Sequence, residues 1–290
     1  MNSSLFRLLR YSGIAWFFRE FVQRNKVTFL LFHDMKQQDA ERNFSWLKSH
    51  YNLISLNDYL DAVTHDSSLP KKAAVITFDD GHVGNYSLLP IIEKMQIPIT
   101  IFLCSGIVGT NRHFWFKHSA DVIPELQRLK SFPDKERLEQ LKKMGYDKLQ
   151  QYNDRQALSK AEVLRMTPWI DFQSHTCFHP ILPLCDDLTA KDEIVNSKIQ
   201  LEKEYGFRIR SLSYPNGDYS IRDIEFTRQA GYECGVTVDP GYNDRDSDLF
   251  RLKRISVNDA ESLDELIVKA SGCYILLKRL LTHKSKTHHL

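Results

Sequence analysis

The stretch Ala73-Ala-Val-Ile-Thr-Phe-Asp-Asp-Gly81 is an apolar run that ends in two adjacent carboxylates and a glycine. The run Ala73–Phe78 is typical of a buried strand, so Asp79 and Asp80 emerge at its carboxyl end, where Gly81 permits a tight turn. Successive side chains that leave a strand point in different directions. One carboxylate can therefore bind a cation while the other faces a water on that cation. Because α/β folds keep their chemistry at the carboxyl ends of strands, the sequence predicts an active site at this turn.

A second polar segment, Ser174-His-Thr-Cys-Phe-His-Pro180, follows another short apolar run. It places His175 and His179 four residues apart. With one carboxylate they make two nitrogen ligands and one oxygen ligand, a set suited to catalytic zinc with an open position for water. The alternatives are ordinary ones. Adjacent aspartates are usually a turn or a helix N-cap, and an isolated histidine pair is more often a surface coincidence than a metal site.

Together the two segments resemble the polysaccharide deacetylase family, the carbohydrate esterases with the NodB homology domain. That family is marked by Thr-Phe-Asp-Asp-Gly and His-(Ser/Thr)-x-x-His, and both patterns stand unaltered at Thr77–Gly81 and His175–His179. The resemblance extends from about Thr28 to Val257. It includes Ile97–Leu103 and Tyr214–Gly217 (Tyr-Pro-Asn-Gly), the second of which is similar to the third motif of one branch of the family.

Short apolar runs alternate with helical patterns along most of the chain, which favours parallel strands with crossover helices. Strands are expected at Val27–Phe32, Ala74–Phe78, Ile99–Leu103, Ile170–Gln173, Ile209–Tyr214, Cys234–Val238 and Arg254–Val257. Helix N-caps are expected at Thr189 and Ser220, and the first of these helices should end before Gly206. The resemblance implies an α/β fold, a distorted (β/α) barrel of about seven parallel strands whose groove lies at their carboxyl ends.

Length and composition agree with one enzyme-sized domain, since 290 residues with 42% hydrophobic content can bury a full core. The barrel is expected over residues 27–262, with a charged, helical insertion at about 116–166 that forms a rim beside the groove. Residues 1–26 and 263–290 read as amphipathic helical ends. The five cysteines form neither a Cys-x-x-Cys pair nor an even-numbered disulfide framework, which favours a reducing compartment. Cys177 reads as a small side chain that fills space rather than as a soft metal ligand.

Basic residues gather at the two ends of the chain. Residues 1–26 hold five basic residues and one acid, a net charge of +4, and residues 269–290 hold five basic residues and no acid, a net charge of +5. The total of +2 therefore leaves −7 for the middle, which argues against nucleic-acid binding. Charged residues interrupt the apolar residues at both ends of the chain, so neither end has an apolar run long enough for a transmembrane helix. The start does not read as a signal peptide. We expect a cytoplasmic protein whose ends either pack on the barrel or contact anionic lipid at the inner membrane.

The resemblance implies a role for each polar residue of the first two motifs. Asp80, His175 and His179 would hold a divalent metal, in the first place Zn²⁺, with Co²⁺, Ni²⁺ or Mn²⁺ as alternatives. Asp79 would accept the proton of the attacking water. A main-chain N–H near Asn216 would help to stabilise the resulting oxyanion.

The general acid departs from the family's common motif order, in which a histidine near the carboxyl end protonates the leaving amine. The candidate in that position is His283, which lies in the basic tail. His33, in Leu31-Phe-His-Asp34, follows the first expected strand and resembles the histidine of a permuted branch, so we expect it to be the acid. The alternative for His33 is a structural residue at a strand end.

The third motif also departs from the family pattern, because Ser213 stands where an arginine usually orients the catalytic aspartate. Arg254 resembles an arginine common in the branch with a Tyr-Pro-x-Gly turn, and we expect it to act as the replacement. The alternative is an ordinary surface arginine. Tyr214, Pro215 and Asn216 are expected to line the sugar site.

The function predicted from these residues is a metal-dependent hydrolase that removes an N-acetyl group from a sugar of a polysaccharide or a lipid-linked glycan precursor. Two alternatives stay open. One is a hydrolase of another bond, such as an O-acetyl ester or a cyclic amide, because the same water activation serves both. The other is a non-catalytic member that binds glycan or lipid.

Overall fold

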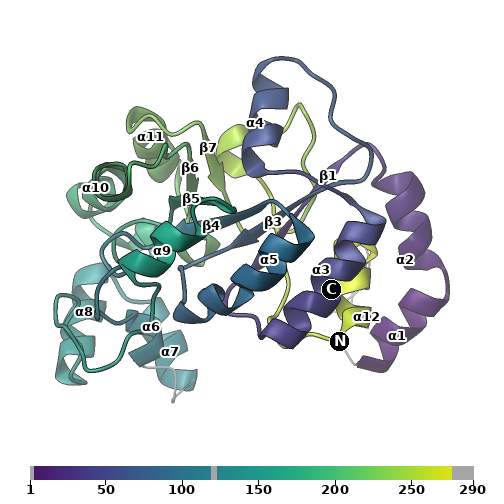
Figure 1. Ribbon diagram of the computed structural model, residues 1–290. Helices are drawn as coiled ribbons and strands as arrows, with labels where there is room; N and C mark the ends of the chain where they lie inside the picture. The colour runs from purple at the N-terminus through teal and green to yellow at the C-terminus, as the bar shows by residue number, and fades with distance from the viewer. Residues whose placement is uncertain (1–2, 119–122, 276–290) are drawn as a thin grey trace, which may run out of the picture.

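The computed structural model describes residues 3–118 and 123–275 of the chain (Figure 1). Its strands are β1 (Val27–Phe32), β2 (Asn52–Leu53), β3 (Ala73–Phe78), β4 (Ile99–Leu103), β5 (Ile170–Ser174), β6 (Ser211–Ser213), β7 (Cys234–Val236) and β8 (Ile255–Ser256). They form one sheet in the order β7-β6-β5-β4-β3-β1-β8, with β2 beside β3. The pairings between strands are parallel. The expected barrel of about seven parallel strands is confirmed.

The sheet curls until its two ends meet through one segment of chain. Leu252 accepts a hydrogen bond from Thr237 N at 2.8 Å and donates to Gly235 O at 3.0 Å, next to β7. Three residues later, Ile255 pairs with Leu30 of β1. The segment between β7 and β8 therefore bridges the gap that a seven-stranded sheet would otherwise leave open, which explains why the barrel is distorted.

The helical elements cover the outside of the sheet and its two ends. They are α1 (Ser3–Tyr11), α2 (Ile14–Phe17), η1 (Phe18–Val22), α3 (Gln37–His50), α4 (Leu56–Thr64), η2 (Val83–Leu88), α5 (Leu89–Met95), α6 (Trp115–His118), α7 (Ile123–Lys130), α8 (Asp134–Lys143), α9 (Lys160–Met166), η3 (Leu182–Leu184), α10 (Asp187–Tyr205), η4 (Pro215–Gly217), α11 (Ile221–Gln229), η5 (Leu249–Arg251) and α12 (Leu263–Ala270). Apolar faces of α3, α5, α9 and α10 pack on the outward side chains of the strands and form the main core.

One of the two expected helix N-caps is confirmed, and the other is wrong. Ser220 caps α11 with a full capping box, as expected. α10 ends at Gly206, whose φ of 71° suits glycine. Its N-cap, however, is Asp186 and not Thr189, because the Asp186 carboxylate accepts the Thr189 N–H at 2.7 Å. The expected cap residue therefore lies inside the first turn.

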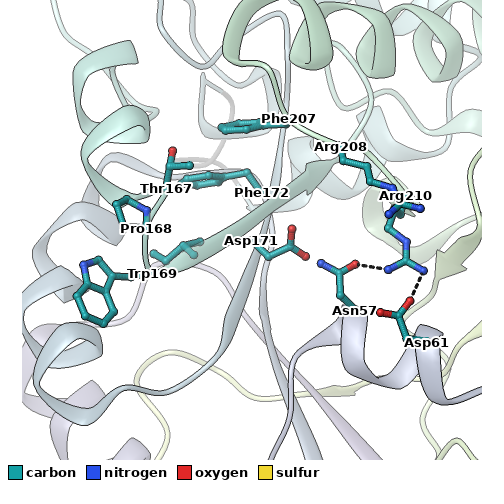
Figure 2. Close-up of a pocket in the computed structure, with 11 residues that line it drawn as sticks. Asn57, Asp61, Thr167, Pro168, Trp169, Asp171, Phe172, Phe207, Arg208 and Arg210 are labelled. Carbon is teal, nitrogen blue, oxygen red and sulfur yellow. Dashed lines mark hydrogen bonds and ion pairs between the residues drawn. The ribbon is translucent and has the colours of Figure 1, made fainter. Parts of the chain in front are cut away.

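The amino-terminal mouth of the barrel is closed by α4. Leu56, Tyr59 and Leu60 insert among inward side chains of β1 and β3. At the rim, Arg210 donates to Asn57 Oδ1 at 3.1 Å and to Asp61 Oδ1 at 2.7 Å (Figure 2). The same figure shows the neighbouring cleft of about 550 Å³, which lies at the amino ends of β5 and β6. Chemistry in this fold is expected at the opposite end.

Two groups of helices lie beside the barrel rather than around it. Between β4 and β5, the helices α6 to α8 gather at one end of the molecule around a small core of their own (Figure 1). At the other side, α1 packs against α12 through Phe6, Leu9, Ile267 and Val268. Within residues 3–118 and 123–275, no helix has the length and apolar character needed to cross a bilayer.

Candidate active site

The turn after β3 directs the two aspartates to different partners. Asp80 has a φ of 71° and Gly81 a φ of 74°, so the chain makes two left-handed steps directly after Asp79. A side chain at position 81 would meet Leu103 Cδ2 at 2.5 Å, so the site also requires glycine for space. Both aspartates are buried, as expected for residues at the end of an inner strand.

Asp80, His175 and His179 come together as the sequence predicted. Their ligand atoms lie within 4.8 Å of one another, and both histidine Nε2 atoms are 3.4 Å from Asp80 Oδ1. His175 is oriented by its other nitrogen, Nδ1, which lies 2.8 Å from Ser213 O. Asp80 Oδ1 is buried and accepts no hydrogen bond from the described residues. An acceptor without a donor between two imidazole nitrogens fits a cation, so these residues fit a metal.

Burial and neighbouring charges shift the pKa of each residue in this cluster. Burial alone would raise the pKa of Asp80, but His82, His175 and His179 hold it well below its ordinary value. Burial lowers the pKa of His179 to about 3, so its imidazole is neutral at physiological pH. For His175 burial acts in the same direction, but the carboxylates of Asp79 and Asp80 outweigh it and raise the pKa. Asp80 and His179 are therefore in the ligand form that metals need, whereas the raised pKa of His175 means that metal binding would displace a proton from this imidazole.

His82 is a partner of Asp80 that the sequence reasoning missed. Its Nε2 lies 2.9 Å from Asp80 Oδ2, and its ring packs edge-on against Phe114 at 5.0 Å between centroids. Because His82 occupies Oδ2, the other oxygen, Oδ1, is left to face His175 and His179. The only available signal was its place directly after the Asp-Asp-Gly turn.

Asp79 is held by Arg254 and Ser213. The Arg254 guanidinium donates from Nη1 to Oδ1 and from Nη2 to Oδ2, both at 2.7 Å, and Ser213 Oγ donates to Oδ2 at 3.0 Å. Burial would raise the pKa of Asp79, but Arg254 and His175 lower it below its ordinary value. Arg254 is itself completely buried, so the alternative of a plain surface arginine is wrong. Ser213, which the sequence showed only as a departure from the family, contacts the same carboxylate.

His33 lies at the carboxyl end of β1 and lines the same pocket as Asp79. Its backbone is fixed on both sides: the N–H donates to Asp259 Oδ1 at 2.9 Å, and the carbonyl accepts from Asn85 Nδ2 at 2.7 Å. The Asp34 N–H donates to the second oxygen of Asp259. Asp259 and Asn85 carried no sequence signal, because their partners are distant in the chain. His283 lies outside the described residues.

The third motif contributes its turn but not its tyrosine. Asn216 lines the pocket, and Lys130 of α7 donates to its Oδ1 at 2.7 Å. Tyr214 is fully buried and donates to Phe250 O at 3.2 Å on the far side of the strand, and Pro215 is buried as well. The expectation that Tyr214 lines the sugar site is wrong. Ser213 faces Asp79, so the next side chain along the strand points the opposite way.

The pocket has a volume of about 390 Å³ and opens at the carboxyl end of the sheet. Besides the residues above, the helical insertion lines it with Trp115, Phe116, Leu126 and Lys130. Phe116 packs on His179 at 4.8 Å between ring centroids, and Trp115 Nε1 donates to His179 O at 2.8 Å. The insertion therefore forms one wall of the site.

Glu193 of α10 supports the loop between the two motif histidines. Its Oε2 accepts the backbone N–H groups of Cys177 and Phe178 at 2.9 and 2.8 Å. Burial raises the pKa of Glu193 to about 7. The Cys177 thiol points toward the same helix and away from Asp80, which agrees with its interpretation as a space-filler. No sequence signal identifies Glu193, which reads as one of many charged residues in a helix.

Comparison with known proteins agrees with this site. The sequence model of the family described as polysaccharide deacetylase matches residues 66–235. YxkH of Bacillus subtilis is 22% identical over 86% of this chain and 76% of that protein. The poly-beta-1,6-N-acetyl-D-glucosamine N-deacetylase of Staphylococcus epidermidis is 24% identical over 83% of this chain and 73% of that protein.

A solved structure shows the same fold. The deacetylase PplD of Streptococcus pyogenes, in complex with acetate, superposes with a TM-score of 0.64 at 18% identity and covers 85% of this chain and 99% of that one. The family match spans more than half of the chain and contains the two aspartates that follow β3 and both clustered histidines. The chain therefore belongs to the polysaccharide deacetylase family and is a deacetylase, a hydrolase of carbon–nitrogen bonds.

Proposed function

We propose that the protein removes an N-acetyl group from a sugar of a polysaccharide or lipid-linked glycan, with a divalent metal held by Asp80, His175 and His179. The observation that carries this proposal is Asp80 Oδ1, a buried acceptor that has no donor among the described residues and lies 3.4 Å from both imidazole nitrogens. Two nitrogen ligands and one oxygen ligand favour Zn²⁺, with Co²⁺, Ni²⁺ and Mn²⁺ as alternatives, over the oxygen-seeking Ca²⁺ and Mg²⁺. When bound, the metal would polarise the acetamide carbonyl and acidify a water.

Asp79 is proposed to be the general base. As the water attacks the carbonyl carbon, its proton passes to the Asp79 carboxylate. Both oxygens of this carboxylate are occupied by Arg254, which fixes its orientation and keeps it ionised. These contacts support the role of a base, because they keep the carboxylate ionised and correctly oriented, although they also lower its affinity for a proton.

His33 is proposed to be the general acid. When the C–N bond breaks, the leaving nitrogen takes a proton, and His33 lines the pocket from β1, next to the strand that carries Asp79. The His33 N–H donates to Asp259 and its carbonyl accepts from Asn85; these bonds support the role because they fix the position of its Cα.

The turn at Asn216 is proposed to stabilise negative charge on the former carbonyl oxygen. The Asn216 N–H donates to no acceptor within residues 3–118 and 123–275. Asn216 lines the pocket, and its φ of 58° departs from helical geometry inside η4. A backbone N–H in the pocket wall that has no acceptor among the described residues supports an oxyanion-binding role.

The substrate is proposed to be an N-acetylated glycan. The S. epidermidis relative is a poly-beta-1,6-N-acetyl-D-glucosamine N-deacetylase, and the half-buried ring of Phe116 offers a face to a pyranose. A cytoplasmic location near the inner membrane and a lipid-linked precursor are the finer parts of this proposal. Their support is the five cysteines, all buried and free, and the basic ends of the chain.

Acetate release distinguishes this proposal from its alternatives. Oligomers of N-acetylglucosamine, a lipid-linked N-acetylated sugar and an O-acetylated glycan are each incubated with the purified chain, with and without a chelator. Release from the N-acetylated substrates that the chelator abolishes supports the proposal. Release from the O-acetylated glycan alone would identify an esterase, and binding of all three without release would identify a non-catalytic member.

A further inference from the structure

The first two helices expose an unusual amount of apolar surface. Sixteen large hydrophobic side chains are exposed in the described part of the chain, and eight of them lie between Leu5 and Val22. We call this surface the N-terminal apolar face; its main members are Leu8, Tyr11, Trp16, Phe17, Phe21 and Val22, which are 46–69% exposed. Single exposed apolar residues are normal, but a contiguous group of them marks an interaction surface.

The face is presented by helices that are anchored elsewhere. Phe6, Leu9 and Ala15 occupy the opposite side of α1 and α2 and pack with Ile267 and Val268 of α12. Figure 1 shows α1 and α2 on the same side of the molecule. On the exposed side the aromatic rings contact one another: Phe21 lies 5.6 Å from Trp16 and 5.3 Å from Phe17 between centroids. The barrel therefore holds a cluster of aromatic rings toward solvent.

The charges around this face are positive. Arg7, Arg24 and Lys26 are exposed and form no ion pair with a residue of the described ranges. The one acid of residues 1–26, Glu20, is neutralised by Arg19 at 2.8 Å and by Lys72 at 3.0 Å. An apolar, aromatic surface flanked by free cations has the composition of an interfacial membrane-binding helix.

Charge also decides between the occupants that this face could take. One candidate occupant is a second copy of the chain, which would bring the same cations to the contact. Another is the chain's own segment 276–290, which carries four basic residues and no acid. Like charges oppose both, whereas anionic lipid headgroups supply the missing negative charge. We propose that the N-terminal apolar face docks the protein on an anionic lipid bilayer, with Trp16, Phe17 and Phe21 in the headgroup region. This docking does not depend on the metal chemistry of the pocket.

Co-sedimentation of the full chain with vesicles tests the proposal. The wild type should bind vesicles of phosphatidylcholine mixed with phosphatidylglycerol, and bind pure phosphatidylcholine more weakly. Trp16→Ser with Phe21→Ser should weaken binding about tenfold for each ring removed. The matched control is Leu188→Ser with Ile221→Ser, which removes side chains that are 72% and 71% exposed on α10 and α11. It should bind as the wild type does.

Charge gives the second arm of the test. Arg7→Gln with Arg24→Gln should reduce binding to the mixed vesicles and flatten its dependence on salt, because the lipid attraction is screened within about 10 Å at 0.1 M salt. All variants should keep the wild-type rate of acetate release from a soluble substrate, so a failure of docking is distinguishable from a failure of the proposed function.

Three results would overturn the proposal. The first is equal vesicle binding by the wild type and the Trp16→Ser, Phe21→Ser variant. The second is a dimer in gel filtration that this variant dissociates, which would make a second copy the occupant. The third is an absence of vesicle binding together with protection of Trp16 from acrylamide, measured against Trp16→Phe, which would mean that the chain covers its own face.

Discussion

Arg254 and Asp79 meet in the floor of the pocket through two parallel hydrogen bonds of 2.7 Å, 175 residues apart in the chain. Both side chains are removed from water, so neither charge is tolerable without the other. Arg254 also donates to Ser213 Oγ and to Thr237 O, which fixes the guanidinium from three directions. The orientation of the proposed base is therefore set by Arg254, which lies directly before β8 and far from Asp79 in the chain.

Arg254→Met tests this pairing. Removal of the guanidinium leaves a buried, uncompensated carboxylate, so the free energy of unfolding at neutral pH should fall by about 3–5 kcal/mol. The direction in which this loss of stability changes with pH follows from the lowered pKa of Asp79. The pair stabilises the fold above the ordinary carboxyl pKa and loses this effect as the pH falls through the folded value, so the variant's deficit should shrink in acid. Urea unfolding at several pH values measures it.

Ser213→Ala is the milder companion, because it removes one hydrogen bond to Asp79 and leaves the ion pair. It should cost about 1 kcal/mol of stability and a modest part of the rate. Equal losses in the two variants would contradict the view that Arg254 is the main partner of Asp79.

The two carboxylates should separate in their effects on metal and on rate. Asp79→Asn should keep the metal and lose turnover, because an amide cannot accept the proton of the attacking water. Asp80→Asn and His179→Ala should lose metal as well. His82→Ala should weaken metal binding by about 10–100-fold, since it removes only the partner of Asp80 Oδ2. Elemental analysis beside acetate release provides both readouts, and parallel metal loss in Asp79→Asn and Asp80→Asn would refute the division of roles.

His33→Ala should retain metal and substrate binding while the chemical step slows about a hundredfold or more. The loss should shrink on an activated acetyl ester, because a phenolate leaving group needs little protonation. His283→Ala is the control and should leave the amide rate near that of the wild type. The opposite pattern, with His283→Ala inactive and His33→Ala active on the amide, would assign the acid to the carboxyl-terminal tail.

The raised pKa of Glu193 predicts that the stability of the fold depends on pH. Its pKa rises from 4.5 to about 7 on folding, so the folded protein binds this proton more tightly than the unfolded chain. The contribution of Glu193 to stability is then greatest below pH 4.5 and falls toward pH 7, by about 3 kcal/mol at most. Glu193→Gln should remove this slope, and Glu204→Gln, on the exposed side of the same helix, should preserve it. An unchanged slope in Glu193→Gln would show that the carboxylate stays ionised throughout.

The sequence predicted the elements whose signal is local. Val27–Phe32 and Ile99–Leu103 are apolar runs with a single threonine each, and they form strands with those bounds. β2 was missed because two residues, Asn52 and Leu53, cannot show a periodicity. The sequence pattern predicts Thr189 as the cap because the cap preference does not distinguish it from Asp186, three residues earlier.

Within the site, motif residues could be predicted and their supports could not. Asp80, His175 and His179 were recognisable because catalytic metal ligands follow short, specific spacings. His82, Asp259 and Glu193 act through contacts that the fold creates, so nothing in their own neighbourhood identifies them. Tyr214 was assigned to the sugar site from its place in the motif, but the alternation of β6 turns it into the core.

The central claim is that a metal at Asp80, His175 and His179 is required for deacetylation by Asp79. It is tested most directly by acetate release from N-acetylglucosamine oligomers with protein stripped by a chelator, before and after addition of Zn²⁺, with Asp79→Asn alongside. The account predicts that stripped protein is inactive, that zinc restores the wild type, and that Asp79→Asn binds zinc and stays inactive. Full activity of verified metal-free protein, or of Asp79→Asn, would contradict it.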